Sequence, residues 1–537
     1  MPTTSREPAV RPVLAALVVS VLLAAAFMLA PPMGTDLSAQ VARAAFADRF
    51  GLAPVDLSWY GGINQFGYSL FTQLLGALIG VRLLGAVAAV VSAAALAWLF
   101  VRSGARRPLL ASILGAVVLV GNLASGRITF AVGLAFGLLA LCAITAQRLA
   151  RPLRLAMGAL LAVVATWASP VAGLFVGLAG AALLLAALRR DDGAGRPLPG
   201  GWRVDRSPIE GLVLCLAPAL AITPMTVLFG NGGIQPYSAE SMRTNVALAV
   251  LVYALVGPRQ RVLRIGALLT VVLVVTAYYL PSPIGSNSLR LPMLLGLPLM
   301  AGYAPVPGPW LAGLLAATVW WQNPVMVGDV LRAGSAESSV AFYRPLTDEL
   351  ARRQPVGRVE VVPLRDHWES AYVPPTVPVA RGWERQVDAD RNALYYADRL
   401  TADAYARWLR DNAVEYVAVA PDAVPDRWAR DEAELVLAGL PYLREVWRSA
   451  DWRLYAVVDH APLVGVPGRL VAADQARVRF TSDRAGEVLV RVRWSRWLSL
   501  TSGDGCLRPG RDGWTEVSVG TPGDFSISSD LIPRNHC

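Results

Sequence analysis

Residues 33–68 read MGTDLSAQVARAAFADRFGLAPVDLSWYGGINQFGY and directly follow the first apolar run of the chain. That run, residues 12–30, is long enough to cross a bilayer and is followed by further apolar runs, which predicts an uncleaved first membrane helix. The stretch then introduces the first carboxylate after an apolar helix, Asp36. We therefore expect a long polar loop that begins at the membrane surface.

The composition indicates a multi-spanning membrane protein with a soluble end. Of the 537 residues, 55% are hydrophobic and 16% are charged, whereas soluble domains carry about 25% charged residues. The apolar runs end near Gln322. All 49 basic residues are arginines, and they are dispersed between the apolar runs, which argues against a nucleic-acid-binding surface.

About eleven apolar runs have the composition of membrane-crossing helices. Residues 66–80 are apolar but too few to cross, and we expect them to form a helix at the surface. Loops rich in arginine alternate with loops that are poor in it, so the positive-inside rule places the N-terminus in the cytoplasm. The loop at residues 33–68 and everything after Gln322 are then extracytoplasmic. The expected crossings are 13–29, 83–101, 108–121, 128–145, 155–167, 171–188, 209–229, 246–256, 265–280, 291–303 and 310–321.

The predicted fold is an α-helical polytopic membrane domain, residues 1–322, followed by an extracytoplasmic part. Residues 323–462 have the pattern of a mixed α/β domain, and residues 463–537 that of a β-rich module. Residues 401–412 are amphipathic, which predicts a helix with Tyr405, Trp408 and Leu409 on its buried face. Expected strands are 357–362, 414–419, 452–458, 477–480, 487–494 and 514–519.

Four cysteines and three histidines limit the metal chemistry of the chain. Cys506 and Cys537 fall in the part that is expected outside the cytoplasm, where disulfides persist. A disulfide between them and a pair of free thiols both remain open. No metal-ligand spacing is present, so we expect no cofactor, and no motif indicates a divalent metal.

Asp36 is the first candidate for a catalytic residue. A carboxylate a few residues past the end of a span lies near the bilayer surface, where a lipid-linked sugar would present its phosphate. Glycosyl transfer needs a base that takes the proton of the acceptor hydroxyl. The alternative is that Asp36 caps the helix expected at residues 37–50, because the sequence Thr35-Asp-Leu-Ser38 suits an N-cap.

Four further residues of this loop form a candidate sugar-binding set: Asp56, Trp59, Tyr60 and Tyr68. Aromatic rings stack on the apolar face of a pyranose, but they also form belts at membrane interfaces. Both interpretations remain open for Trp59. The glycine pair after Tyr60 permits close backbone approach or a positive φ.

Two arginines in short outward loops, Arg127 and Arg290, are candidates for binding a donor phosphate. A guanidinium matches a phosphate with bidentate geometry. The alternative is that both side chains snorkel to the membrane interface.

The tail contains two clusters of polar and aromatic residues, 366–372 and 380–386. We interpret them as the lining of an acceptor cleft. The alternative is a salt-bridged core in which Trp383 is buried and Glu384 pairs with Arg381 or Arg385. The candidate acceptor-binding residues are His367, Glu369, Arg381, Trp383 and Glu384.

Together these features resemble the GT-C superfamily of multi-spanning membrane glycosyltransferases. The resemblance lies in Thr35-Asp36 at the start of a long first outward loop, in the number of spans, and in a tail with the motif Ala380-Arg-Gly-Trp-Glu-Arg-Gln386. More narrowly, the chain is similar to actinobacterial multi-pass membrane proteins with these tail motifs. Many members carry two acids close together in the loop, whereas here the next acids after Asp36 are Asp48 and Asp56.

The resemblance implies transfer of a sugar from a polyprenyl-phosphate donor to a cell-envelope glycan acceptor on the outer side of the membrane, with inversion at the anomeric carbon. It also implies an acidic catalytic residue in the first loop, which corresponds to Asp36, and the lipid bilayer as a partner. Two other functions remain open, a secondary transporter and a non-catalytic glycan-binding scaffold. Transporters place polar sites at mid-membrane, and here the span interiors are almost free of ionisable residues.

Overall fold

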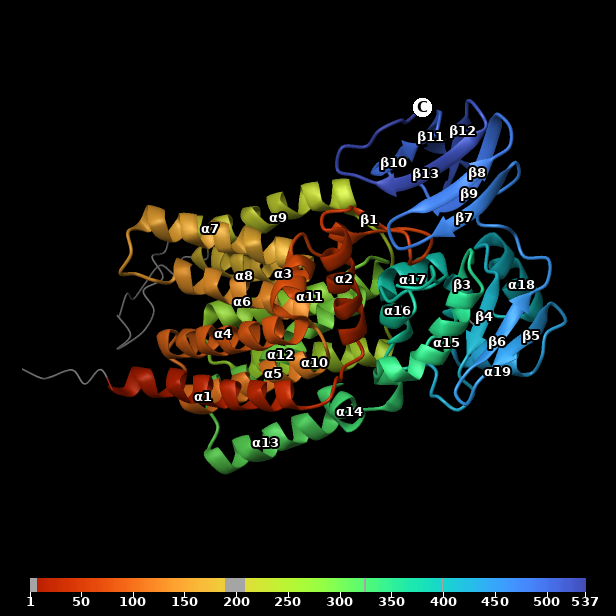
Figure 1. The fold of residues 1–537 in the computed structure, drawn as a ribbon. Helices are drawn as coiled ribbons and strands as arrows, with labels where there is room; N and C mark the ends of the chain where they lie inside the picture. The colour runs from red at the N-terminus through yellow and green to blue at the C-terminus, as the bar shows by residue number, and fades with distance from the viewer. Residues whose placement is uncertain (1–6, 189–207, 323–324, 398) are drawn as a thin grey trace, which may run out of the picture. The chain divides into compact units, whose positions relative to one another are not determined.

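The computed structural model describes residues 7–188, 208–322, 325–397 and 399–537 (Figure 1). The chain divides into two compact units. The first unit contains the apolar helices. The second unit contains the polar tail together with Thr35–Gly67 and the short segment Phe229–Gly233. The loop after the first helix therefore folds with the end of the chain.

The first unit is a bundle of apolar helices, and each apolar run expected to cross coincides with one of them (Figure 1). Within the described ranges, six helices are long and apolar enough to cross a membrane, and α5 and α6 are shorter apolar helices. The chain is therefore a membrane protein, while a total of about eleven crossings stays a prediction. The helices are α1 (Glu7–Leu29), α4 (Val81–Arg102), α5 (Pro108–Ala124), α6 (Ile128–Ile144), α7 (Arg151–Ala168), α8 (Pro170–Leu188), α9 (Ile209–Phe229), α10 (Ala239–Leu255), α11 (Arg261–Tyr279), α12 (Arg290–Tyr303), α13 (Gly308–Trp321) and α14 (Val325–Leu331).

Helix α3 (Thr72–Ile79) occupies the short apolar run that was expected not to cross. Its eight residues extend about 12 Å, far less than the hydrocarbon core of about 30 Å. The bundle itself packs through small residues, as membrane helices commonly do. A Cβ added to Gly133 would lie 2.7 Å from Ala172, and one added to Gly180 would lie 2.8 Å from the carbonyl of Gly211.

A cavity of about 250 Å³ lies inside the bundle. Its lining is almost entirely apolar, with hydroxyl groups from Ser103, Thr145, Thr270 and Tyr303. Among the residues that the structure describes, no charged side chain lines it. A transporter that moves ions or polar solutes would need polar groups at this depth, so the cavity does not favour that function.

The α/β part of the second unit is built on a mixed sheet with the strand order β3-β4-β6-β5. The predicted amphipathic helix is confirmed as α18 (Ala402–Asp411), and its Tyr405, Trp408 and Leu409 pack in one core with Val417. β3 and β4 are parallel, and the other pairs are antiparallel. The elements are α15 (Val340–Arg352), β3 (Val359–Val361), α16 (Glu369–Tyr372), α17 (Arg385–Arg391), β4 (Tyr416–Val419), α19 (Arg430–Leu437), β5 (Leu443–Arg448) and β6 (Arg453–Val457).

The end of the chain forms two antiparallel sheets that share one hydrophobic core, with the orders β10-β13-β8-β7 and β11-β12-β9. Val55 and Leu57, from the loop after the first helix, are buried in the same core. Strand β1 (Val55–Asp56) pairs with β2 (Ile63–Asn64), and β1 is part of this module because Val55 is buried in its core. The strands are β7 (Gly468–Ala473), β8 (Val478–Ser482), β9 (Gly486–Arg493), β10 (Leu498–Ser502), β11 (Gly505–Pro509), β12 (Trp514–Val519) and β13 (Gly523–Ser529).

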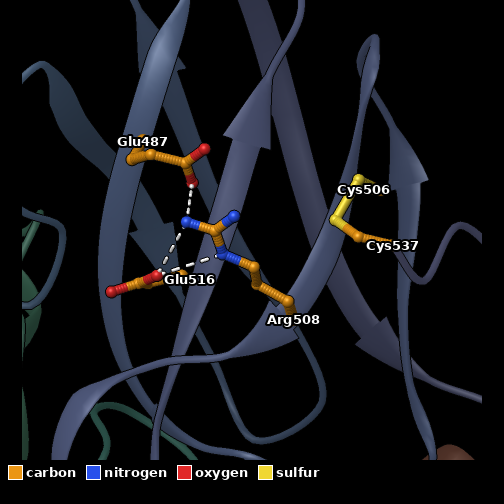
Figure 2. The surroundings of a disulfide bond; sticks show 5 residues. All are labelled: Glu487, Cys506, Arg508, Glu516 and Cys537. Atoms are coloured by element: carbon orange, nitrogen blue, oxygen red, sulfur yellow. Dashed lines mark hydrogen bonds and ion pairs between the residues drawn. A yellow bond between two sulfur atoms is a disulfide. The ribbon is translucent and has the colours of Figure 1, made fainter.

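Cys506 on β11 and Cys537 at the C-terminus form a disulfide (Figure 2). Backbone hydrogen bonds also join β11 to the C-terminal residues: the N–H of Leu507 donates to the carbonyl of Asn535, and the N–H of Cys537 donates to the carbonyl of Leu507. The alternative of two free thiols is therefore wrong. Cys142 and Cys215 of the bundle are free thiols.

Replacing Cys506 with serine should destabilise the terminal module. The two cysteines are 31 positions apart, and opening a loop of that size costs about 3–4 kcal/mol in the chain-entropy description. Thermal unfolding should show a lower melting temperature for C506S, and dithiothreitol should lower that of the wild type only. A stabilising disulfide would be contradicted if C506S had the melting temperature of the wild type and if dithiothreitol left the melting temperature of the wild type unchanged.

Candidate functional site

Asp36 lies at the start of α2 (Leu37–Phe50), which has the bounds that the sequence predicts. The helix forms because alanines and other strong helix formers dominate it, and Gly51 ends it with a φ of 59°. Asp36 occupies the capping position, but its side chain makes no capping hydrogen bond. The capping interpretation is therefore wrong, because the Asp36 side chain does not make the hydrogen bond that defines an N-cap.

The residue before Asp36 is held by the tail motif. The indole Nε1 of Trp383 donates a hydrogen bond of 2.9 Å to the carbonyl of Thr35, across 348 positions of sequence. The Trp383 ring stacks on the imidazole of His367, with centroids 3.4 Å apart and planes at 12°. Nδ1 of His367 lies 3.3 Å from Oε1 of Glu369. These contacts fix the backbone beside Asp36.

A second tie joins α2 to the same motif. Nη2 of Arg43 lies 2.5 Å from Oε2 of Glu384, and both side chains are largely buried. Gln386 donates to the other carboxylate oxygen at 2.8 Å. The alternative of a salt-bridged Glu384 is thus correct in kind, but its partner is Arg43 and not Arg381 or Arg385. A partner 341 positions away leaves no local signal in the sequence.

Trp59 and Tyr60 are buried, with 1% and 3% of their surface exposed. The Trp59 indole donates to the carbonyl of Ser370 at 3.0 Å, and the Tyr60 hydroxyl donates to that of Gly382 at 2.8 Å. A Cβ at Gly382 would lie 2.3 Å from the Trp59 ring. In this structure the rings fix the tail motif, and neither has a free face for a sugar or for a membrane belt.

Asp56 also has a structural position. Its Oδ1 accepts hydrogen bonds from the backbone N of Ser58 at 2.8 Å and from the Ser58 hydroxyl at 2.6 Å. Burial raises the pKa of Asp56 to about 6, although these hydrogen bonds oppose the shift. Its contact with a sugar stays a prediction, and the observed partners assign it to the turn before Trp59.

Arg381 lies in a buried ionic network. Its guanidinium is 2.8 Å from Asp388, 3.0 Å from Glu432 and 3.8 Å from Glu360. Burial and the neighbouring Glu432 raise the pKa of Glu360, whereas Arg381 offsets the burial of Asp388 and holds its pKa below the ordinary value. Arg381 is thus neutralised within the α/β core, where an acceptor does not reach it.

In the first unit, Arg127 and Arg290 each lie at the start of a helix. Arg127 directly precedes α6, and Arg290 is the first residue of α12. The Arg290 guanidinium lies 5.1 Å from the centre of the Phe130 ring, and Phe130 is one turn beyond Arg127. Arg290 is buried, which argues against snorkelling. Both arginines thus lie beside helix N-termini, whose partial positive charge favours phosphate.

Asp48 and Tyr68 are the remaining residues of the first loop to be placed. Asp48 is exposed and follows Asp36 by about 18 Å along α2, so the two acids do not form a close pair. Tyr68 begins the next segment of the first unit and is half-buried. Within the described part of the chain, no group of three histidine, cysteine or acidic side chains could hold a metal ion.

No protein-family model matches the sequence, and no curated protein is similar enough to match it. Several solved structures are similar to the chain, and these structures are GT-C glycosyltransferases. Arabinofuranosyltransferase AftD from Mycobacteria is 15% identical, with a TM-score of 0.43 over 96% of this chain. The chain spans 57% of the length of that protein.

Two other similar structures come from different organisms. The Archaeoglobus fulgidus oligosaccharyltransferase, tethered to an acceptor peptide, is 11% identical with a TM-score of 0.42, over 83% of this chain and 74% of its own. ArnT from Cupriavidus metallidurans, bound to undecaprenyl phosphate, is 14% identical with a TM-score of 0.27, over 84% and 99%. At these scores the assignment of function rests on the residues of this chain.

Asp56→Asn should change how stability depends on pH. The pKa of Asp56 is about 6 in the folded protein, above its ordinary value of 3.8, so the folded state holds this proton more tightly than the unfolded state does. The protonated Asp56 carboxyl stabilises the folded state fully below about pH 4, and this stabilisation is lost as the pH rises to about 6. The loss in the free energy of unfolding amounts to about 3 kcal/mol. The melting temperature of D56N relative to wild type should therefore rise over that interval. A constant difference would contradict a titration at this site.

Proposed function

We propose that this chain is a membrane glycosyltransferase that moves a sugar from a polyprenyl-phosphate donor to a cell-envelope glycan acceptor on the outer side of the membrane. The observation that carries the proposal is the setting of Asp36. Its carboxylate begins an ordered helix without capping it, and Trp383 holds the preceding carbonyl. A general base needs a carboxylate whose backbone is fixed before the substrate binds.

In the proposed reaction Asp36 accepts the proton of the acceptor hydroxyl. The acceptor oxygen forms a bond to the anomeric carbon, and the bond from that carbon to the phosphate oxygen breaks on the opposite face. The configuration is inverted, and the polyprenyl phosphate leaves with the electron pair. No cofactor is required for this displacement.

The donor phosphate is assigned to Arg127 and Arg290. Both lie at helix starts in the first unit, and Arg290 is kept in place over Phe130. Guanidinium groups stabilise the negative charge that develops on the phosphate as the sugar leaves. Within the first unit, the backbone of Gly34 packs against the turn that leads to Arg127, because a Cβ there would lie 2.5 Å from Ser125.

The proposed orientation keeps the N-terminus in the cytoplasm and the second unit outside. The arginine-rich loops support it through the positive-inside rule. The disulfide between Cys506 and Cys537 supports it independently, because such bonds persist in oxidising compartments. A secondary transporter is less well supported, since the cavity in the bundle is apolar.

Asp36→Asn should lower transfer by about 10²- to 10⁴-fold, the usual contribution of a general base. Purified protein would be incubated with polyprenyl-phosphate sugars and envelope acceptors, and labelled product would be counted. Asp48→Asn is the matched control, since it removes an exposed carboxylate from the same helix and should leave transfer unchanged. Equal transfer by D36N would remove Asp36 from its role. A folded wild type that is inactive with every donor would favour the scaffold or the transporter.

Trp383→Phe should lower kcat about tenfold and change KM little, because it keeps a ring against His367 but removes the donor to Thr35. Small displacements of a catalytic group have effects of this size. Trp408→Phe is the control, since its Nε1 makes a hydrogen bond of the same length, 2.9 Å, to Asn392 within the α/β core. Equal loss of activity in both variants would indicate general destabilisation of the second unit.

A further inference from the structure

The glycine pair at Gly61-Gly62 brings two arginines close together within the second unit. Both glycines have a positive φ, 74° and 134°. Nη1 of Arg391, at the end of α17, donates to the carbonyl of Gly62 at 2.9 Å. The backbone N of Arg493, at the end of β9, donates to the carbonyl of Gly61 at 2.7 Å. A Cβ at Gly62 would lie 3.7 Å from that of Arg493.

An aromatic ring supports this pair. The Arg493 guanidinium lies 3.8 Å from the centre of the Trp514 ring, and its Nη1 donates to the backbone carbonyl of Asp512 at 2.8 Å. A third arginine, Arg358, contacts the same ring at 5.7 Å and is fully buried. Arg391 and Arg493 are only half-buried, so solutes can reach them.

The carboxylates of Glu384, Asp390 and Asp512 attract these two guanidinium groups, but among the described residues none of them forms an ion pair with either arginine. Within the described residues, neither Arg391 nor Arg493 forms an ion pair, and the hydrogen bonds recorded for them go to backbone carbonyls. Arg508 on β11 shows the contrast, because it lies between Glu487 and Glu516, at 3.1 and 3.2 Å (Figure 2). Glu384, which attracts Arg391, is itself paired with Arg43.

Placing Arg391 and Arg493 close together and partly out of water makes it less favourable for both side chains to carry their positive charge. Burial and the charge of Arg391 lower the pKa of Arg493 to about 10. Burial also lowers the pKa of Arg391. In addition, Nε of Arg493 is buried and lacks a hydrogen-bond partner, which is costly for a charged donor. An anion placed between the two guanidinium groups would offset the repulsion between them.

We propose that Arg391 and Arg493 form a binding site for an oxyanion, the phosphate or carboxylate group of a ligand. Two planar forks of N–H donors suit the oxygens of such a group. Trp514 and the backbone carbonyls keep both forks in place before the ligand arrives, which limits the ordering cost of binding. The proposal is independent of glycosyl transfer, because it concerns binding at residues that have no part in the displacement.

Isothermal titration of the full chain, in nanodiscs of phosphatidylcholine, tests the site. The probes are inorganic phosphate, glucuronate and short-chain phosphatidylglycerol, each against sodium chloride of equal ionic strength. We expect saturable binding of at least one probe. Phosphate binding alone indicates a free phosphate, glucuronate binding a sugar acid, and phosphatidylglycerol binding alone a lipid headgroup.

Arg493→Gln and Arg391→Gln should each weaken that binding by about 10- to 100-fold, the value of a hydrogen bond to a charged group. Arg493→Lys should have an intermediate effect, because it keeps the charge and loses the fork. Arg508→Gln, in the same module but already paired, should bind like the wild type. Absence of saturable binding to the wild type, or equal weakening by R508Q, would overturn the proposal. Neither result bears on the D36N transfer assay.

Discussion

The second unit depends on the buried pairing of the first loop with the tail. Arg43 and Glu384 form an ion pair that is almost inaccessible to water, and removing either partner would leave an uncompensated charge in the interior. Trp383 and Tyr60 add hydrogen bonds between the same two segments. The structure around Asp36 is therefore complete only when residues far along the chain have folded onto it.

This constraint explains how the polar residues are divided. Most of the polar and aromatic residues in the sequence motifs are buried and have structural partners. Asp56 stabilises a turn, Trp59 donates a hydrogen bond to Ser370, and Arg381 neutralises carboxylates within the α/β core. Such groups are buried with their partners because an unpaired polar group is costly there. Asp36 differs, since the helix that it precedes does not use its side chain as a cap. The proposed site is thus Asp36 beside a fixed backbone, rather than a broad cleft lined by every motif.

Sequence patterns were reliable where the signal is local. Hydropathy located the membrane helices, and periodicity located α18 and the start and end of α2. Ion pairs between distant segments have no such signal, so the partner of Glu384 was assigned to a neighbour. Strands such as β5 were also missed, because its largely exposed side chains show no alternation of apolar and polar residues. The small residue in the Arg381-Gly-Trp383 motif was the one available clue that an aromatic ring packs closely there.

A third segment gives the loop its remaining support. Asn231 accepts a hydrogen bond from the backbone N of Asn64 at 2.8 Å and donates to its carbonyl at 3.0 Å. Phe229 stacks on Trp497 with ring centroids 5.1 Å apart. The loop is therefore held by Phe229–Gly233 as well as by the tail. A base contributes most when its position is fixed before the substrate binds. These contacts fix the far end of the loop, while Trp383 and Arg43 fix its beginning, and a loop held at both ends suits the proposed role of Asp36.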